Sequence, residues 1–265
     1  MRKTMLIDTS KCMACRACQI ACKQWNQLPA EPTSFTGSYE NPVGISPVTW
    51  TRIVFQEKEA SNSEEFSWYF SKHGCMHCND AACATVCPTG AIYHTDAGTV
   101  NVDFDKCIGC NYCAANCPFQ VISFDRRTNV PPKCTFCYDR IVNGFKPACS
   151  NVCPSDALKY GDRGKMINAA FDRVAYLNNN GNPRAQVYGD TELEGLGMLY
   201  VLEDSPEYYG FPTDPTVSTS ARIWGAILTP FRVLLALLVV IGVLANRSEY
   251  NKVSRASKKK DDKGV

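Results

Sequence analysis

The stretch CIGCNYCAANCP, residues 107–118, places four cysteines at the spacing C-x2-C-x2-C-x3-C and follows the last of them directly with a proline. The whole chain of 265 residues contains 16 cysteines. Its first residues do not read as a secretory signal, because Arg2 and Lys3 are followed by only a short apolar run before Asp8. Cysteines at this density, in a chain that is neither small nor visibly secreted, indicate metal ligands rather than a disulfide framework.

The same pattern recurs four times along the chain, and no cysteine is left over. Each quartet begins with C-x2-C and ends with C-x3-C, while the gap between these halves varies. A proline follows every quartet but the first, after which the spacing of Cys22, Trp25 and Leu28 predicts a helix that continues to Pro29. In chain order the quartets are Cys12, Cys15, Cys18 and Cys22; Cys75, Cys78, Cys83 and Cys87; Cys107, Cys110, Cys113 and Cys117; and Cys134, Cys137, Cys149 and Cys153.

Residues 107–118 match the run of cysteines that binds 4Fe-4S clusters in bacterial ferredoxins. In ferredoxins with two clusters, the first three cysteines of a run bind one cluster and the fourth binds the other. Three thiolates on a tight loop can reach three corners of a cubane, whereas the fourth lies about one helical turn further on and points towards the neighbouring cubane. Sixteen cysteines therefore predict four 4Fe-4S clusters, with quartets that share ligands in pairs.

The second and third quartets form the natural pair, because they lie 32 residues apart and are joined by a predicted strand at 91–94, a turn at 96–98 and a strand at 100–102. The first and fourth quartets must then form the other pair. This pairing predicts four ligand sets: Cys12, Cys15, Cys18 and Cys153 for cluster 1; Cys134, Cys137, Cys149 and Cys22 for cluster 2; Cys75, Cys78, Cys83 and Cys117 for cluster 3; and Cys107, Cys110, Cys113 and Cys87 for cluster 4.

One ferredoxin-like unit is thus expected inside another, in an α+β fold with two clusters in each unit. Residues 1–70 plus 125–160 would form the outer unit, and residues 71–124 the inserted unit. Residues 161–221 are expected to add a covering extension. Its predicted elements are an amphipathic helix at 162–178 and strands at 185–188 and 198–202.

Residues 222–246 predict a transmembrane helix, because positions 223–245 are mostly apolar and would extend about 34 Å as a helix. The competing interpretation is a buried core helix, since Arg232 limits the uninterrupted apolar run to 233–245. Residues 247–265 form a basic tail, which the positive-inside rule places in the cytoplasm, with the cluster units on the periplasmic or exoplasmic side. Because no export signal is recognised, either a partner with its own signal carries the folded protein across or this orientation is wrong. We expect the former, since the clusters must be assembled in the cytoplasm.

Other functions find little support in the sequence. Zinc is the alternative for cysteine ligands, but zinc sites usually draw on separated C-x2-C pairs. His73, His77 and His94 are expected to be surface or supporting groups rather than ligands. No nucleophile elbow, Walker A or dinucleotide motif is present, so we expect the chain to carry electrons and not to transform a substrate itself.

The charge of the chain gives no support to nucleic-acid binding. The formal net charge of +2 counts no thiolates. Each oxidised cluster with its four thiolates carries about −2, so the loaded chain would carry about −6. Basic residues would therefore partly balance the clusters rather than attract phosphates.

Four stretches contain the quartets: CMACRACQIACKQWN at 12–26, CMHCNDAACATVCPTGAIY at 75–93, CIGCNYCAANCPF at 107–119 and CTFCYDRIVNGFKPACSNVCPSDALKYGDR at 134–163. Together they resemble the iron–sulfur (beta) subunits of membrane-bound formate dehydrogenases, within the electron-transfer subunits of molybdopterin oxidoreductases. The quartets are typical of the wider family. The wording ACKQWN and YDRIVNG, with WGAILTP at the start of the apolar segment, is similar to formate dehydrogenase in particular.

The resemblance implies an electron-transfer subunit in a complex of anaerobic respiration. A catalytic (alpha) subunit with molybdenum or tungsten on two pterin guanine dinucleotides would oxidise formate and would usually supply a twin-arginine export signal. A membrane cytochrome b (gamma) subunit would accept the electrons and reduce quinone. Quartets one and four would face the catalytic subunit, and quartets two and three the membrane side. The alternative is the same relay in a hydrogenase or sulfur-compound oxidoreductase complex.

Overall fold

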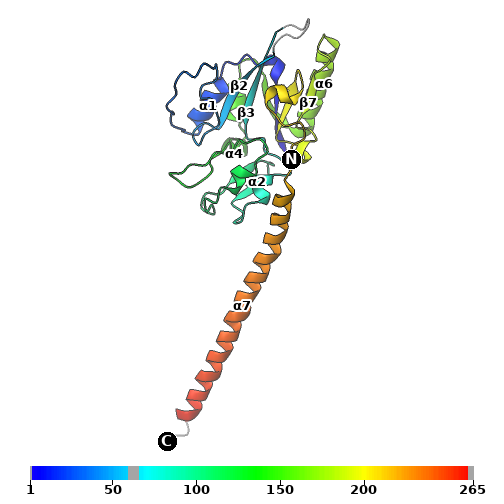
Figure 1. Ribbon diagram of the computed structural model, residues 1–265. Coiled ribbons are helices and arrows are strands. Elements are labelled where there is room, and N and C mark those ends of the chain that lie inside the picture. Colours follow the sequence, from blue (N-terminus) through cyan, green and yellow to red (C-terminus); the bar gives the residue numbers. More distant parts are fainter. Residues whose placement is uncertain (1, 59–65, 262–265) are drawn as a thin grey trace. The chain divides into compact units, whose positions relative to one another are not determined.

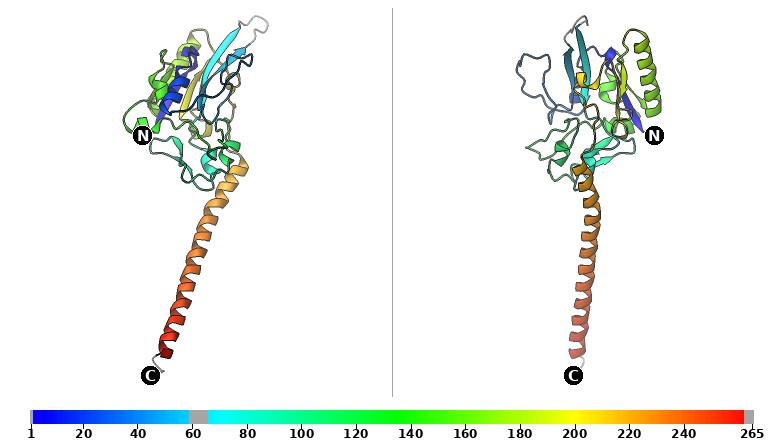
Figure 2. Two further views of the ribbon diagram at one scale, coloured as in Figure 1. Left: turned by 90° about the vertical axis from the view of Figure 1, so that its left-hand side faces the viewer. Right: turned by 45° about the vertical axis from the view of Figure 1, so that its right-hand side comes forward.

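The computed structural model describes residues 2–58 and 66–261, without the side chains of 227–233, 236, 248–249 and 251–261. It divides into two compact units, Met1–Ala221 and Arg222–Val265, and each is described by itself. The first unit combines three small sheets with short helices, which is the mixed α+β content expected from the sequence (Figures 1 and 2).

The largest sheet has the strand order β6-β1-β8-β7 and joins the beginning of the first unit to its end. β1 (Lys3–Asp8) pairs antiparallel with β6 (Leu158–Asp162) and parallel with β8 (Met198–Leu202). β7 (Gln186–Tyr188) pairs antiparallel with β8. The central strands β1 and β8 therefore hold together segments that lie nearly 200 residues apart in the chain, since Met5 is aligned with Met198.

The two faces of this sheet have different neighbours, because successive side chains of a strand point to opposite faces. On one face Leu6 and Leu199 pack with Ala170 of helix α6 (Arg163–Asn179), which lies along the sheet (Figures 1 and 2). On the other face Met5 packs in a core that contains cysteines such as Cys149. The helix and both strands predicted for the extension are confirmed to within one residue at each end.

Two β-hairpins complete the strand structure. β4 (Ile92–His94) and β5 (Val100–Val102) pair antiparallel, which confirms the hairpin predicted between the second and third quartets. β2 (Thr51–Lys58) and β3 (Ser67–Gly74) form a longer antiparallel ladder in which Ile53 lies opposite Lys72. This second hairpin was not predicted from the sequence.

A short helix begins one residue before the third cysteine of every quartet. Each helix therefore carries that cysteine in its first turn, and in the last three quartets the fourth cysteine follows two residues after the helix ends. The repeat in the sequence is thus a repeat in the backbone. The four helices are α1 (Ala17–Trp25), α2 (Ala82–Thr85), α3 (Tyr112–Ala115) and α5 (Ala148–Asn151).

Helix α1 is the longest of these four, and its end corrects one prediction. It ends at Trp25, whereas the apolar pattern after the first quartet predicted a helix up to Pro29. Gln27 has a φ of +51°, a left-handed conformation that a right-handed helix does not continue through. Another short helix, α4 (Tyr138–Val142), follows the first two cysteines of the fourth quartet. The described residues also form three short 3-10 helices, η1 (Thr9–Lys11), η2 (Glu192–Glu194) and η3 (Pro206–Tyr209).

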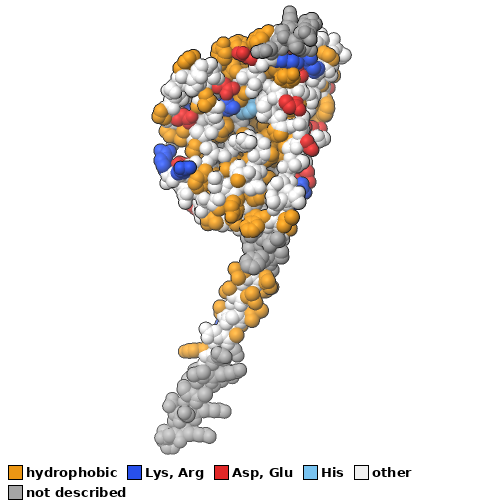
Figure 3. All heavy atoms as spheres, viewed as in Figure 1, with side chains coloured by type: hydrophobic (Ala, Val, Ile, Leu, Met, Phe, Trp, Pro, Cys, Tyr) orange, Lys and Arg blue, Asp and Glu red, His pale blue; other side chains and the backbone are white. Residues whose placement is uncertain are grey.

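The second unit is formed by the greater part of helix α7 (Thr219–Asp261). Its described side chains include a run of large apolar residues, and Figure 3 shows hydrophobic side chains along the face of the helix in view. Leu235, Val239 and Ile241 are 54%, 60% and 61% exposed. Nothing in the described part of the chain therefore covers this run.

The transmembrane segment predicted at 222–246 is only partly described. The side chains of 227–233 and 236 lie outside the described residues. Among the helices searched over the described residues, none combines the length and apolar character that crossing a bilayer requires. The tail predicted at 247–265 is helical as far as Asp261, and its residues 262–265 lie outside the described residues.

Candidate metal centres

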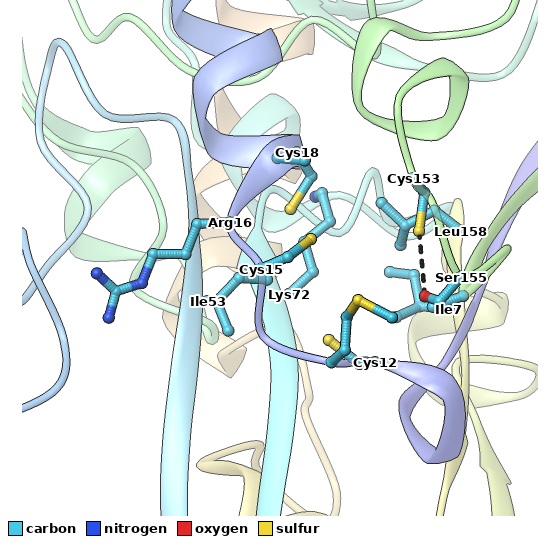
Figure 4. Close-up of a pocket in the computed structure, with 13 residues that line it drawn as sticks. Ile7, Cys12, Cys15, Arg16, Cys18, Ile53, Lys72, Cys153, Ser155 and Leu158 are labelled. Atoms are coloured by element: carbon cyan, nitrogen blue, oxygen red, sulfur yellow. Dashed lines mark hydrogen bonds between the residues drawn. The ribbon is translucent and has the colours of Figure 1, made fainter.

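The cysteines gather into four sites, which we number as the predicted clusters. Site 1 is a pocket lined by Cys12, Cys15, Cys18 and Cys153 (Figure 4). Its other walls include the apolar side chains of Ile7, Ile53 and Leu158. The space between atoms in this pocket, including its open mouth, is about 390 Å³. Three cysteines of the first quartet thus meet the last cysteine of the fourth.

Site 2 is a second pocket, lined by Cys22, Cys134, Cys137 and Cys149. Met5, Trp50 and Met198 contribute to its walls, and the space between its atoms is about 330 Å³. Here three cysteines of the fourth quartet meet the last cysteine of the first. Sites 1 and 2 therefore exchange their fourth cysteines.

Site 4 shows the same arrangement for the inner pair of quartets. Its pocket is lined by Cys87, Cys107, Cys110 and Cys113, and the space between its atoms is about 330 Å³. Cys87 is the last cysteine of the second quartet, whereas the other three belong to the third. The walls include Ile92, from the predicted hairpin.

Site 3 contains the remaining four cysteines. Burial raises the pKa of Cys78 well above its ordinary value, and the charges of Cys75, Cys83 and Cys117 raise it further. Burial likewise raises the pKa of Cys117, with Cys75 acting in the same direction. The four thiols are therefore electrostatic neighbours, although Cys117 comes from the third quartet and the others from the second.

The four sites follow one another in a row. Burial raises the pKa of Cys18 in site 1, Cys134 in site 2 and Cys83 in site 3, and in each of them a cysteine of the next site adds to the rise. That neighbour is Cys149 of site 2, Cys75 of site 3 and Cys113 of site 4, respectively. The order along the row is therefore 1, 2, 3 and 4.

The two ends of the row are the most accessible. Cys15 of site 1 and Cys110 of site 4 are exposed, whereas every cysteine of sites 2 and 3 is buried or of intermediate exposure. The inner sites are thus enclosed by protein, and the outer sites reach the surface.

The cysteines of these sites are better explained as ligands of 4Fe-4S clusters than as separate free thiols. Burial raises the pKa of Cys18 and Cys83 to about 12, and that of Cys113 to about 11, so these thiols are neutral until an electrophilic metal draws off their protons. The thiols of each pocket surround a space with apolar walls, as the ligands of a multi-iron group do. Over the described residues, no three His, Cys, Asp or Glu side chains group as ligands of a single metal ion.

The histidines take three different positions, and none lines the pockets of sites 1, 2 and 4. His94 is exposed. The ring of His73 stacks on Phe211 with centroids 4.5 Å apart, and burial lowers its pKa to about 3. His77 is only 1% exposed, and its Nδ1 accepts a hydrogen bond of 3.0 Å from the backbone N–H of Val100. His77 thus braces the second quartet against strand β5.

Two buried lysines beside the cysteines were missed in the sequence. Lys72 is 1% exposed and lines the pocket of site 1, and Lys133 is 2% exposed and precedes Cys134 directly. Lysine is almost never fully buried without a partner, which is why the sequence alone gives no reason to place these two inside. The one available signal was their position, three residues before Cys75 and one residue before Cys134.

Comparison with known protein families agrees with the assignment of these cysteines to 4Fe-4S clusters. Two family models described as a 4Fe-4S dicluster domain match residues 11–91 and 66–163. Two dicluster matches and 16 cysteines imply four 4Fe-4S clusters.

Several curated proteins are similar over most of the chain. The nitrate-inducible formate dehydrogenase iron–sulfur subunit of Escherichia coli strain K12 is 41% identical over 229 residues, which are 85% of this chain and 77% of that protein. The formate dehydrogenase iron–sulfur subunit of Haemophilus influenzae is 39% identical over 85% of this chain and 73% of that protein. The thiosulfate reductase electron transfer subunit PhsB of Salmonella typhi is 40% identical over 59% of this chain and 74% of that protein.

Proposed function

Because this chain belongs to the family of formate dehydrogenase iron–sulfur subunits, we propose that it carries electrons within a complex that oxidises formate. The chain is an electron-transfer subunit, as its relatives are named, and is not itself the catalytic subunit. The 4Fe-4S clusters would supply the redox chemistry, one electron at a time. The residues of this chain would hold them, space them and set their surroundings.

The crossed pockets are the observation that carries the proposal. Sites 1, 2 and 4 are each lined by three cysteines of one quartet and the last cysteine of its partner. This supports the ligand sets predicted from the sequence, with the fourth set, Cys75, Cys78, Cys83 and Cys117, supported by the mutual influence of its thiols. The crossing supports an outer unit of residues 1–70 plus 125–160 and an inserted unit of residues 71–124.

The row of sites suits transfer between two partners. Cys15 and Cys110 are the exposed cysteines, and they lie at the two ends of the row. Electrons would enter near one exposed end, pass the enclosed sites 2 and 3, and leave near the other. Enclosure of the inner sites keeps water and oxidants from the electrons in transit and helps to set the potentials.

The partners follow from the resemblance rather than from this chain alone. A molybdenum or tungsten catalytic subunit would dock at the site 1 end and a membrane cytochrome b subunit at the site 4 end. This orientation agrees with quartets one and four facing the catalytic subunit. The direction of flow under physiological conditions would depend on the potentials of both partners.

The apolar run of α7 supports attachment of the complex to a membrane. The five successive residues Leu237, Leu238, Val239, Val240 and Ile241 are all more than half exposed, and five successive positions of a helix go once round it. A helix that is apolar all round needs an apolar environment on every side. We therefore propose that residues 222–246 lie in the bilayer beside the cytochrome subunit, with the basic tail in the cytoplasm and the cluster units on the periplasmic or exoplasmic face.

A second candidate is the same relay in a complex that reduces a sulfur compound. The similarity to the thiosulfate reductase electron transfer subunit favours it, although that match covers 59% of the chain against 85% for the formate dehydrogenase subunits. The cysteine quartets serve both functions equally. The identity of the electron donor must therefore be measured.

The test is to purify the chain with its native partners from membranes, add formate without any other reductant, and record EPR spectra. Reduction of several 4Fe-4S signals by formate is expected. If dithionite reduces the clusters but formate does not, the chain is still an electron relay, but formate is not its electron donor. Absence of 4Fe-4S signals under both reductants would overturn the relay itself.

A further inference from the structure

Lys72 is a buried cation without a hydrogen-bond partner. Its side chain is 1% exposed, and within the described part of the chain its Nζ contacts no acceptor at hydrogen-bonding distance. Strand β3 fixes the residue, because Lys72 is aligned with Ile53 and its carbonyl accepts a 2.7 Å hydrogen bond from the Tyr200 hydroxyl. The backbone of Lys72 is therefore fixed, and its side chain is enclosed.

The ammonium of Lys72 lies beside site 1 and close to the wall of site 2. A Cβ placed on Gly74 would lie 3.5 Å from the Lys72 Nζ and 3.2 Å from the hydroxyl oxygen of Thr51, which lines the pocket of site 2. Its side chain lines the pocket of site 1 and extends towards Cys18 (Figure 4). Burial raises the pKa of Cys18 in site 1 and of Cys149 in site 2, and in both cases Lys72 is the strongest opposing influence. One cation therefore acts on the cysteines of two sites.

Lys133 occupies the corresponding position between sites 2 and 3. Its Nζ lies 3.7 Å from the sulfur of Cys75 in site 3 and 3.1 Å from the carbonyl oxygen of Cys134 in site 2. A further hydrogen bond to the carbonyl of Val100 anchors the ammonium to strand β5. Burial raises the pKa of Cys83 in site 3, and Lys133 is the strongest opposing influence.

Buried ammonium groups need opposite charge nearby, because an unpaired buried charge is strongly unfavourable. In the described part of the chain, no hydrogen bond joins either ammonium to an aspartate or glutamate. Both face cysteines that would become thiolates around a cluster of net negative charge. The clusters on either side of each lysine would supply its counter-charge.

We propose that Lys72 and Lys133 are fixed positive charges at successive junctions of the row, and that each raises the reduction potentials of the two clusters beside it. Lys72 acts on sites 1 and 2, and Lys133 acts on sites 2 and 3. Reduction adds negative charge to a cluster, and a cation in a low-dielectric interior stabilises that added charge. This inference rests on the proposed function, since it requires the four clusters to be present.

The consequence is a gradient of protein charge along the relay. Site 2 has a buried lysine on both sides, sites 1 and 3 have one, and among the buried residues described no lysine lies beside site 4. Clusters with the same type and ligands would thus be given different potentials by two side chains.

The test uses the complete complex with Lys72→Met or Lys133→Met, and a redox titration of all 4Fe-4S signals by EPR. Methionine keeps an unbranched side chain, one heavy atom shorter than that of lysine, and removes the charge. In each variant two of the four midpoint potentials should fall. One potential should fall in both variants, and one should stay unchanged in both. This pattern needs no prior assignment of signals to sites.

The matched control is Lys159→Met, which removes an exposed lysine from strand β6 and should leave all four potentials unchanged. Unchanged potentials in Lys72→Met with full iron content would overturn the inference, as would an equal fall of all four. If Lys72→Met loses clusters, Lys72→Arg decides the matter. If Lys72→Arg retains its clusters at unchanged potentials, the positive charge at this position sets the potentials, as proposed. If Lys72→Arg also loses its clusters, the role of Lys72 is to pack the interior, and the inference is overturned. A wild-type complex without four cluster signals would instead overturn the proposed function and this inference with it.

Discussion

Cys153 lies beside Cys12 in one pocket, although the first and last cysteines of the chain are the most distant pair in the sequence. The antiparallel pairing of β1 with β6 brings them together, because Ile7 near the end of β1 is aligned with Leu158 at the start of β6. The segment that leaves β1 and the segment that enters β6 therefore lie at the same end of this strand pair. A single strand pair therefore brings the end of the fourth quartet beside the start of the first.

The crossed ligand sets predict the effect of removing one thiol at an end of the row. Cys110→Ser should damage site 4 alone, because Cys110 lines only that pocket among those described. The purified complex should lose about four of sixteen irons and one EPR signal. Cys15→Ser is the matched variant, since Cys15 is also exposed but lines site 1. Loss of the same signal in both variants would contradict the pairing.

The cluster ligands could be predicted because the cysteines of one quartet lie close together in the sequence. A tight loop and one helical turn are determined by a few residues, so the number of clusters, the hairpin at 91–102 and the helix at α6 could be predicted. The β2–β3 hairpin was missed because its strands mix polar and apolar residues without strict alternation, as in TRIVFQEK. The parallel pairing of β1 with β8 was missed because nothing local specifies a partner so far along the chain.

The buried lysines mark a different limit of the sequence. Lysine is usually exposed, so a sequence gives no reason to expect it in the interior. The proposed reason for burial here is the negative charge of the clusters, which does not come from the amino-acid sequence. The predicted continuation of α1 to Pro29 was wrong because the backbone at Gln27 is left-handed. Non-glycine residues adopt that conformation rarely, and the apolar pattern gives no sign of it.

A second prediction concerns the loop that holds site 4. Gly109 has a φ of +70°, and a Cβ at this position would lie 2.6 Å from the backbone oxygen of Asn129. Gly109→Ala should therefore displace the loop and lower the iron content of site 4. Gly90 has a similar φ of +66° but open space around it, so Gly90→Ala should cost only about 1–2 kcal/mol of stability through backbone strain.

Iron content and thermal unfolding should be measured on each preparation of the two glycine variants. The comparison distinguishes backbone strain at positive φ from the steric contact of the new Cβ with Asn129. A clearly lower iron content in Gly109→Ala than in Gly90→Ala is expected. Equal losses in both would mean that the left-handed conformation, and not the contact with Asn129, is the decisive constraint.

A third prediction concerns Asp204, which anchors the hairpin that carries Lys72. Its carboxylate lies 3.0 Å from the Lys58 ammonium, 3.0 Å from the Tyr69 hydroxyl and 3.1 Å from the Arg184 guanidinium. Burial raises the pKa of Asp204, but the hydrogen bonds from Ser205, Lys58 and Tyr69 outweigh it and hold the pKa below its ordinary value. Asp204→Asn should lower the free energy of unfolding by about 2 kcal/mol at neutral pH.

The pH dependence follows from the direction of that shift. A lowered pKa contributes stability that is fully present above the unfolded-state value of about 4 and is lost only as pH falls through the folded-state value. The difference between wild type and Asp204→Asn should therefore be constant from pH 5 to 8 in denaturant titrations of the loaded protein. A difference that grows between pH 6 and 8 would assign the effect to another group.

A fourth prediction concerns the order of iron loss. Cys15 and Cys110 are exposed, whereas the cysteines of sites 2 and 3 are buried or partly buried. A strong iron chelator added with mild oxidant should therefore bleach two of the four signals first, and the remaining two only later. Uniform loss of all four signals would show that access through the exposed cysteines does not limit the reaction.

A fifth prediction concerns the second unit. Deletion of residues 222–265 removes α7 beyond the first unit and should release a complex that still contains its clusters, because the cysteines all lie before Ala221. The matched control deletes only residues 247–265, which keeps the apolar run of 233–245. That shorter deletion should leave the complex in the membrane fraction, since the proposed attachment is burial of the apolar run and does not need the basic tail. Fractionation with an iron assay of both fractions measures the outcome, and membrane retention of the longer deletion would assign the attachment to a partner subunit.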